Sequence, residues 1–157
     1  MPRPRNYSRE SIAREIAIIL SHSDISERTK LHFARGAQWG WTEFDGKIEG
    51  CRWWSQAAID ARARDPKAKL IHEHVVPRKV LAQRLVRLNP ITPDAVFDLL
   101  TRFAIACIVT PEEDARLSKG TRTRMPEPFD DPAHPDYDNP WLRYRLAGIT
   151  VVDRANF

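Results

Sequence analysis

The chain has 157 residues, of which 42% are apolar and 29% charged, a composition typical of a globular protein and not of a disordered one. No apolar run approaches the roughly 20 residues needed to cross a bilayer, so we expect no membrane-spanning helix. The basic segment 1–5 is not followed by the apolar core of a secretory signal, so we expect no signal peptide. The two distant cysteines, Cys51 and Cys107, predict reduced, buried thiols in a cytoplasmic protein. The formal net charge of +4 is compatible with a polyanionic partner.

The first third of the chain predicts helices. Ser8 or Ser11 can cap a helix that runs to about Ser21 and carries Ile12, Ile16, Ile19 and Leu20 on one face. A second helix is expected from Ser26 to Ala34, ending at Gly36. Two helices joined by a short break, together with a basic arm, also permit a DNA-binding module.

The stretch from Gly36 to Gly50 holds Trp39, Trp41 and Phe44 and predicts a loop or hairpin. Its rings either close over a small core or stack on unpaired bases, and we favour the core. A third helix is expected over 52–64, because Trp53, Trp54 and three alanines recur at helical spacing. Asp65-Pro66 ends it.

The next element is an aliphatic strand over 70–76 that contains His72, Glu73 and His74 and ends at Pro77. Burying such groups without partners is costly, so they indicate a site. In a regular strand Glu73 and His74 point to opposite faces, and His72 is then the better partner for His74. Glu73 and His74 can share a metal only if the strand bends before Pro77, and we expect that bend. The alternative is a pair of inert histidines on an edge strand.

Two helices, over 77–88 and from Thr92 to Phe103, are expected before a second apolar strand over 104–109. Thr110 as N-cap, Pro111 and Glu113 then form the start of another helix. Asp114 lies on the same face as Leu117, the side chain expected to point at the sheet, so we select it over Glu112 as a carboxylate that needs a partner.

The last segment, 118–140, is rich in proline and polar residues and predicts a long loop. It holds His134, which is a candidate third ligand, a substrate contact or an inert side chain. A short helix from Asn139-Pro140 to Gly148 and a closing strand over 149–152 follow.

The string from Glu73 to Pro77 resembles the opening signature of the HNH, or His-Me finger, endonucleases, and the join over 107–117 is similar to the strand-to-helix step of their ββα-metal unit. The resemblance implies phosphodiester hydrolysis with His74 as general base and Glu73 and Asp114 as ligands of one divalent ion. Mg²⁺ is favoured, with Mn²⁺ or Zn²⁺ as alternatives. Asp114 stands where this family usually has a histidine. Further candidate site residues are His72, Glu113 and His134.

We therefore predict an α+β domain over 1–157: a mainly helical region (1–66), a ββα-metal-like core with a helical insertion between its two strands (67–118), and a loop, short helix and closing strand (119–157). The predicted activity is metal-dependent endonucleolytic cleavage of DNA, with RNA as a possible substrate. Side chains that can hold phosphate oxygens are Arg78, Lys79, Arg84, Arg122 and Arg124. The alternatives are a non-catalytic DNA-binding module and a structural zinc protein that uses His72, His74 and either Asp114 or Cys107.

Overall fold

The computed structural model describes residues 7–156. The predicted basic segment 1–5 lies outside this range. Within it the chain forms seven α-helices, two short 3-10 helices and one four-stranded sheet, which confirms the α+β class. Across these described residues, none of the helices combines the length and apolar character needed to cross a membrane.

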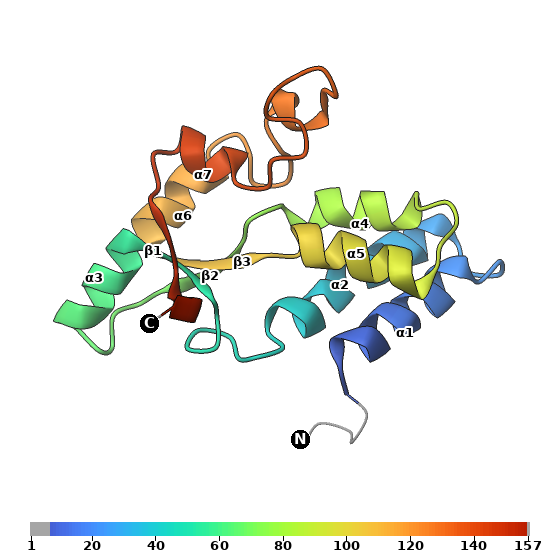
Figure 1. Ribbon diagram of the computed structural model, residues 1–157, viewed down its shortest axis with the longest axis horizontal. Helices are drawn as coiled ribbons and strands as arrows, with labels where there is room; N and C mark the ends of the chain where they lie inside the picture. The colour runs from blue at the N-terminus through green and yellow to red at the C-terminus, as the bar shows by residue number, and fades with distance from the viewer. Residues whose placement is uncertain (1–6, 157) are drawn as a thin grey trace.

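Four helices pack together on one side of the molecule (Figure 1): α1 (Arg9–Ser21), α2 (Glu27–Thr42), α4 (Arg78–Val86) and α5 (Pro93–Phe103). Helix α1 lies against α5, and α2 lies against α4. Their apolar faces form the largest core cluster, in which Leu20, Leu85 and Leu100 are fully buried. This layer supports the strand that carries the histidines, because α2 and α4 flank its end.

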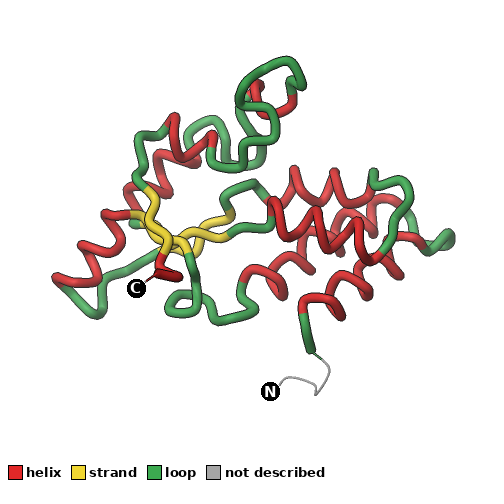
Figure 2. The backbone as a smooth tube through the Cα atoms, viewed as in Figure 1, coloured by secondary structure: helices red, strands yellow, loops and turns green. Residues whose placement is uncertain are grey.

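The sheet lies beside this helical layer (Figure 2) and has the strand order β2-β3-β1-β4. The strands are β1 (Trp53–Ser55), β2 (Ile71–His74), β3 (Ala106–Val109) and β4 (Val151–Asp153). β1 runs parallel to β3 and antiparallel to β4. β2 runs antiparallel to β3, with Glu73 opposite Cys107 and His74 opposite Ala106. As predicted, α4 and α5 separate β2 from β3 in the chain.

The remaining elements surround the sheet: α3 (Gln56–Arg64), α6 (Pro111–Ser118), α7 (Leu142–Leu146), and the 3-10 helices η1 (Glu127–Asp130) and η2 (Arg154–Asn156). Helix α6 contacts β2. A second core cluster includes Val75, Cys107, Leu117 and Tyr144. Both cysteines are free and buried, as predicted from the sequence.

Local capping signals located the helix starts well. The Ser8 hydroxyl accepts from the Ser11 amide at the start of α1, and Thr92 caps α5 in the same way. Thr110 and Glu113 form the predicted capping box of α6. Each of these bonds joins residues three apart, so the amino-acid string alone determines it.

The predicted end of the second helix at Gly36 is wrong, because α2 continues to Thr42. A helical glycine costs about 1 kcal/mol relative to alanine, a penalty that tertiary contacts can offset. Here Gln38 is buried and its Nε2 donates to the carbonyls of Ala34 and Arg78 at 3.0 Å each. Trp41 packs edge-on against Phe97 of α5, with ring centroids 5.3 Å apart. The predicted loop or hairpin over 36–50 is therefore helical in its first half.

The predicted helix over 52–64 begins only at Gln56, because Trp53–Ser55 forms strand β1. Trp53 and Trp54 pair with Cys107 and Ile108 of β3, more than fifty residues further along the chain. Ser55 ends the strand and caps α3, since its Oγ accepts from the amide of Ala58 at 3.0 Å. Helical spacing of the apolar residues predicted the wrong structure for these three residues.

Candidate site at the end of strand β2

The side chains of β2 alternate regularly between two faces. His72 and His74 lie on the face that α2 covers, where the Trp39 ring centroid is 5.7 Å from that of His72 and 4.5 Å from that of His74. Glu73 points to the other face, toward α6 and α7. The pairing with β3 stays regular through His74, and the Val75 amide still donates to the Ile105 carbonyl at 3.0 Å. The predicted bend before Pro77 is therefore wrong, and Glu73 and His74 face apart.

Glu73 is held by two residues of α7 that sequence reasoning missed. Arg143 Nη1 donates to Glu73 Oε1 at 3.1 Å, and the Tyr144 hydroxyl donates to Oε2 at 2.6 Å. The Arg143 side chain is only 2% exposed. The same guanidinium donates to three backbone carbonyls, those of His74, Val75 and Leu117. Glu73 is thus part of a buried ionic network that joins β2, α6 and α7.

Asp114 lies close enough to Glu73 for the two carboxylates to repel each other. Burial raises the pKa of Glu73; Arg143 and Tyr144 oppose that rise, and the charge of Asp114 adds to it. Asp114 is half-buried, and its carboxylate forms no ion pair or hydrogen bond with any residue of the described chain. The two predicted metal ligands, Glu73 and Asp114, are therefore within electrostatic reach of each other, and His74 lies on the opposite face.

The two histidines are buried, and their ring nitrogens lack partners. Nδ1 and Nε2 of His72 and Nε2 of His74 are inaccessible to solvent and form no hydrogen bond with the part of the chain that is described. Burial, with a smaller contribution from the neighbouring His72, lowers the pKa of His74 to about 3. Burial also lowers the pKa of His72, while the charge of Glu43 opposes that change. Both imidazoles are therefore neutral at pH 7.

The two other candidate ligands have different roles. Glu113 is buried, but its carboxylate accepts from the Thr110 amide at 3.0 Å and from the Ser55 hydroxyl at 2.5 Å. It joins α6 to β1 and has a structural explanation. His134 is exposed, and its Nδ1 accepts from the Asp136 amide at 3.0 Å within the same loop.

The predicted phosphate-binding side chains lie in three places. Arg78 stacks on Trp39, with its guanidinium carbon 4.5 Å from the ring centroid, and donates to the Arg35 carbonyl at 3.1 Å. Lys79, Arg84 and Arg124 line one groove between α4 and the loop that follows α6. Arg122 is exposed in that loop.

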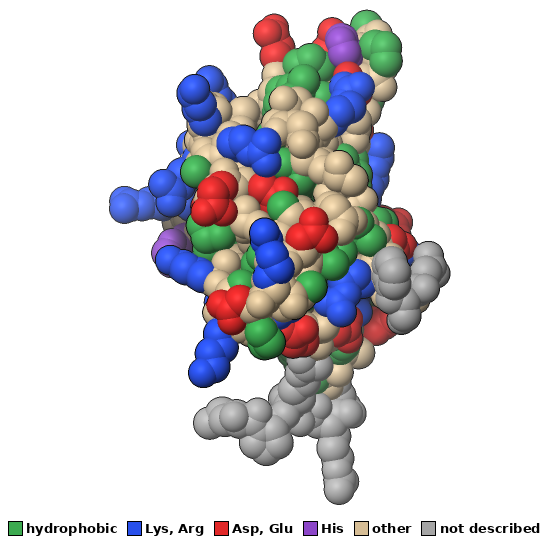
Figure 3. All heavy atoms as spheres, turned by 90° about the vertical axis from the view of Figure 1, so that its left-hand side faces the viewer, with side chains coloured by type: hydrophobic (Ala, Val, Ile, Leu, Met, Phe, Trp, Pro, Cys, Tyr) green, Lys and Arg blue, Asp and Glu red, His purple; other side chains and the backbone are tan. Residues whose placement is uncertain are grey.

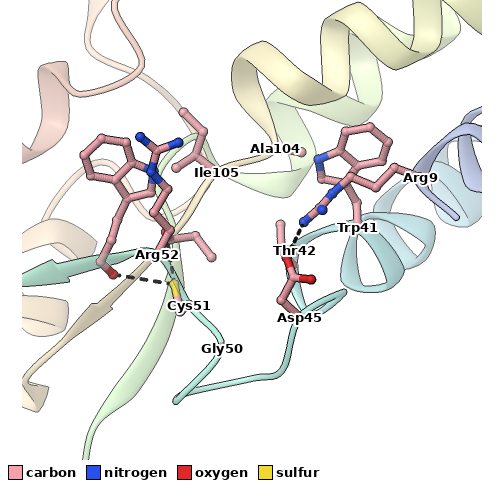
Figure 4. A pocket seen from close by; sticks show the side chains of 11 residues that line it. Arg9, Trp41, Thr42, Asp45, Gly50, Cys51, Arg52, Ala104 and Ile105 are labelled. Carbon is pink, nitrogen blue, oxygen red and sulfur yellow. Dashed lines mark hydrogen bonds and ion pairs between the residues drawn. The ribbon is translucent and has the colours of Figure 1, made fainter. Parts of the chain in front are cut away.

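A separate hollow of about 150 Å³ lies between the helical layer and the sheet (Figure 4). The Arg9–Asp45 ion pair, at 3.0 Å, is on one side of it, and Cys51 lies on the other, with its Sγ 3.3 Å from the Ala106 carbonyl. None of the predicted site residues lines this hollow. The candidate residues do not form it, although Ala106, which lines it, is the β3 partner of His74.

Among the residues described, no three His, Cys, Asp or Glu side chains converge as a metal-binding group. Comparison of the chain with protein-family models, with curated proteins and with solved structures gives no match.

Proposed function

We propose that this protein is a metal-dependent endonuclease of the HNH type that hydrolyses phosphodiester bonds in DNA. One observation carries the proposal. β2 and β3 are antiparallel neighbours, only Thr110 separates β3 from α6, and this strand-strand-helix order brings Glu73 and Asp114 within electrostatic reach of each other. Interpreting this unit as a ββα-metal core is part of the proposal and rests on the resemblance of the segment 73–77 to the HNH signature.

The carboxylates fit a hard divalent cation. Mg²⁺ in nucleic-acid enzymes is held by one or two carboxylates, with water and phosphate oxygens completing its shell. Asp114 has an uncompensated charge, and Glu73 is oriented by Tyr144 and Arg143 in the way that hydrogen-bonded neighbours orient a ligand carboxylate. Glu73 and Asp114 would hold the ion, which supplies Lewis-acid polarisation of a phosphate oxygen when bound.

His74 is the proposed general base. Its imidazole is neutral at pH 7, and Nε2 has no hydrogen-bond partner in the described chain, so its lone pair is free. Burial makes the imidazole a weak base in this form, so the role requires that the site opens to water and that the pKa of His74 rises toward its ordinary value. Because His74 and Glu73 face apart, a phosphodiester reaches both residues only by lying across the end of β2. Trp39 covers His74 on the other side and has to move before water can reach the imidazole.

The test is plasmid nicking in Mg²⁺, Mn²⁺ or EDTA by the wild type and by His74→Ala. We expect His74→Ala to abolish cleavage and to change DNA affinity by only a few-fold, because a general base acts in the transition state. Asp114→Ala should lower metal affinity and cleavage together, and the control Glu112→Ala should do little. Substantial cutting by His74→Ala would end its assignment, and greater damage from Glu112→Ala would end that of Asp114.

The regular strand favours a second candidate, a transition-metal site at His72 and His74. Their ring centroids are 5.6 Å apart, and three of their four ring nitrogens are buried without a partner. Neutral imidazoles are ordinary zinc ligands. Cys107 lies in the core cluster on the Glu73 side of the sheet, so the ligand set proposed from the sequence does not assemble around the histidines. About one zinc per chain that resists mild chelation, is lost in His72→Ala and accompanies no DNA cleavage would favour this candidate.

A further inference from the structure

A basic groove of about 550 Å³ runs between α4 and the loop that follows α6. Its α4 wall carries Lys79, Gln83 and Arg87, which are spaced four residues apart and therefore share one side of the helix. The opposite wall carries Thr123 and Arg124. From Lys79 to Arg87 the helix rises about 12 Å, a length that spans three to four phosphates at about 3.4 Å of axis per strand charge.

Arg84 joins the two walls of the groove. Its Nη1 lies 2.7 Å from Asp138 Oδ1, and its Nη2 lies 3.1 Å from Asp130 Oδ1. Its guanidinium carbon also lies 4.3 Å from the ring centroid of Phe129, a fully buried residue of η1. These contacts fasten the 119–140 segment to α4, and Figure 1 shows the segment after α6 in the upper part of the view, between α7 and α4. Arg84 therefore binds the loop segment to α4, and its guanidinium is not free to bind phosphate.

Three cations in the groove remain uncompensated. Lys79, Arg87 and Arg124 are exposed, and no ion pair within residues 7–156 involves any of them. Arg124 uses only Nε, which donates to the Gly120 carbonyl at 2.6 Å, so both Nη groups are available. Asp130, the one acidic residue that lines the groove, is already paired with Arg84. In contrast, basic and acidic side chains mix over the face shown in Figure 3.

Both walls of the groove are joined through the chain to elements of the proposed active site. Its α4 wall follows β2 after three residues, so Lys79 lies five positions beyond His74. Its loop wall continues from α6, the helix that carries Asp114. The Lys79 end of the groove is therefore the end nearer in the chain to β2, which carries Glu73 and His74.

We infer that this groove binds the phosphate backbone of the nucleic acid. Lys and Arg contacts to phosphate position a protein on nucleic acid, and base contacts specify the sequence. The groove lining has no aromatic side chain on which bases could stack. The choice of nucleic acid as the polyanion rests on the proposed function.

The test is fluorescence anisotropy of a labelled DNA duplex in EDTA, where metal-dependent cleavage is absent. The groove variant is Lys79→Gln/Arg87→Gln/Arg124→Gln. The control is Arg14→Gln/Arg28→Gln/Lys67→Gln, which removes the same charge from exposed residues elsewhere that also form no ion pair in the described chain. Three lost phosphate contacts should reduce the slope of log affinity against log salt by about 2.7. A fourfold rise in salt should then weaken the wild type about 40-fold more than the groove variant.

Equal slopes for the wild type and the groove variant, or an equal change in the control, would overturn the inference. Competition by polyglutamate as effective as that by unlabelled DNA would also overturn it, because the occupant would then be an acidic polypeptide. The proposed function fails separately. Wild-type protein that binds DNA through the groove but cuts nothing in Mg²⁺ or Mn²⁺ would leave the groove assigned and remove the nuclease.

Discussion

Replacing Arg143 with methionine keeps an unbranched side chain and removes a guanidinium that is 2% exposed. Glu73 then loses its cation, and the carbonyls of His74, Val75 and Leu117 lose a donor. Removing one partner of a buried ion pair costs about 3–5 kcal/mol. At about 2–4 °C per kcal/mol for a chain of this size, the melting temperature should fall by about 6–20 °C.

The loss should depend on pH. Burial already raises the pKa of Glu73 in the folded protein, and Arg143 opposes that rise, so Arg143→Met raises the pKa further. A carboxyl whose folded pKa exceeds its unfolded value contributes most to stability below the unfolded value of about 4.3, and that contribution is lost as pH rises through the folded pKa. The variant should therefore be closer to wild-type stability near pH 4 than near pH 7.5. Urea unfolding, monitored by tryptophan fluorescence at pH 4 and at pH 7.5, measures the free energy of unfolding of the wild type and of the variant.

Glu73→Gln is the matched control, because the amide oxygen still accepts from Tyr144 while the charge is removed. In the double variant Glu73→Gln/Arg143→Met, the two losses should be much less than additive, since residues in one buried network couple by about 0.5–3 kcal/mol. Additive losses, or a penalty for Arg143→Met that is equal at both pH values, would show that the ion pair is not what stabilises this end of β2.

Two further predictions concern α2 and His74. Gly36→Ala should stabilise the protein by about 0.5–1 kcal/mol, because the new methyl group meets no atom within 4 Å, and the urea midpoint should rise at an unchanged m-value. Gly40→Ala is the contrasting case, with its methyl group 3.2 Å from the Tyr7 hydroxyl, and an equal gain there would contradict the packing explanation. The pKa of His74 falls to about 3 on folding, below its unfolded value, so stability should decline as pH drops from about 6.5 towards 3. His74→Gln should flatten that decline, and an unchanged pH profile would contradict the burial of a neutral imidazole.

The predictable parts of the fold are those determined over three or four residues. Thr92 and Thr110 were identified as helix starts, and Ser8 as one of two candidates with Ser11, because each side chain satisfies an amide three positions away. The errors lie where residues far away in the chain determine the secondary structure. Trp53 and Trp54 fit a helix locally, but β3 and β4 recruit them into a sheet from more than fifty and about one hundred residues away.

The candidate site shows the same difference between what local sequence predicts and what distant residues determine. A carboxylate inside an apolar strand needs a cation as a partner. For Glu73 the sequence predicted that this cation is a metal ion. Arg143 lies seventy residues away in a five-residue helix, and its burial has no local signal. The requirement for a positive charge was thus predictable, and the guanidinium that meets it was not.

Arg143 also determines which side chains can share one face. Turning Glu73 toward His74 requires an extra residue or a bend in β2, a change that breaks the local ladder. Such a bend would have to release the Val75 amide from the Ile105 carbonyl and the carbonyls of His74 and Val75 from Arg143. Those bonds hold β2 in the regular form. In that form His72 and His74 share a face, and the Glu73 carboxylate is bonded to Arg143 and Tyr144 of α7. The Arg143→Met variant therefore bears on function as well as stability, because it removes two of the three bonds that oppose the bend.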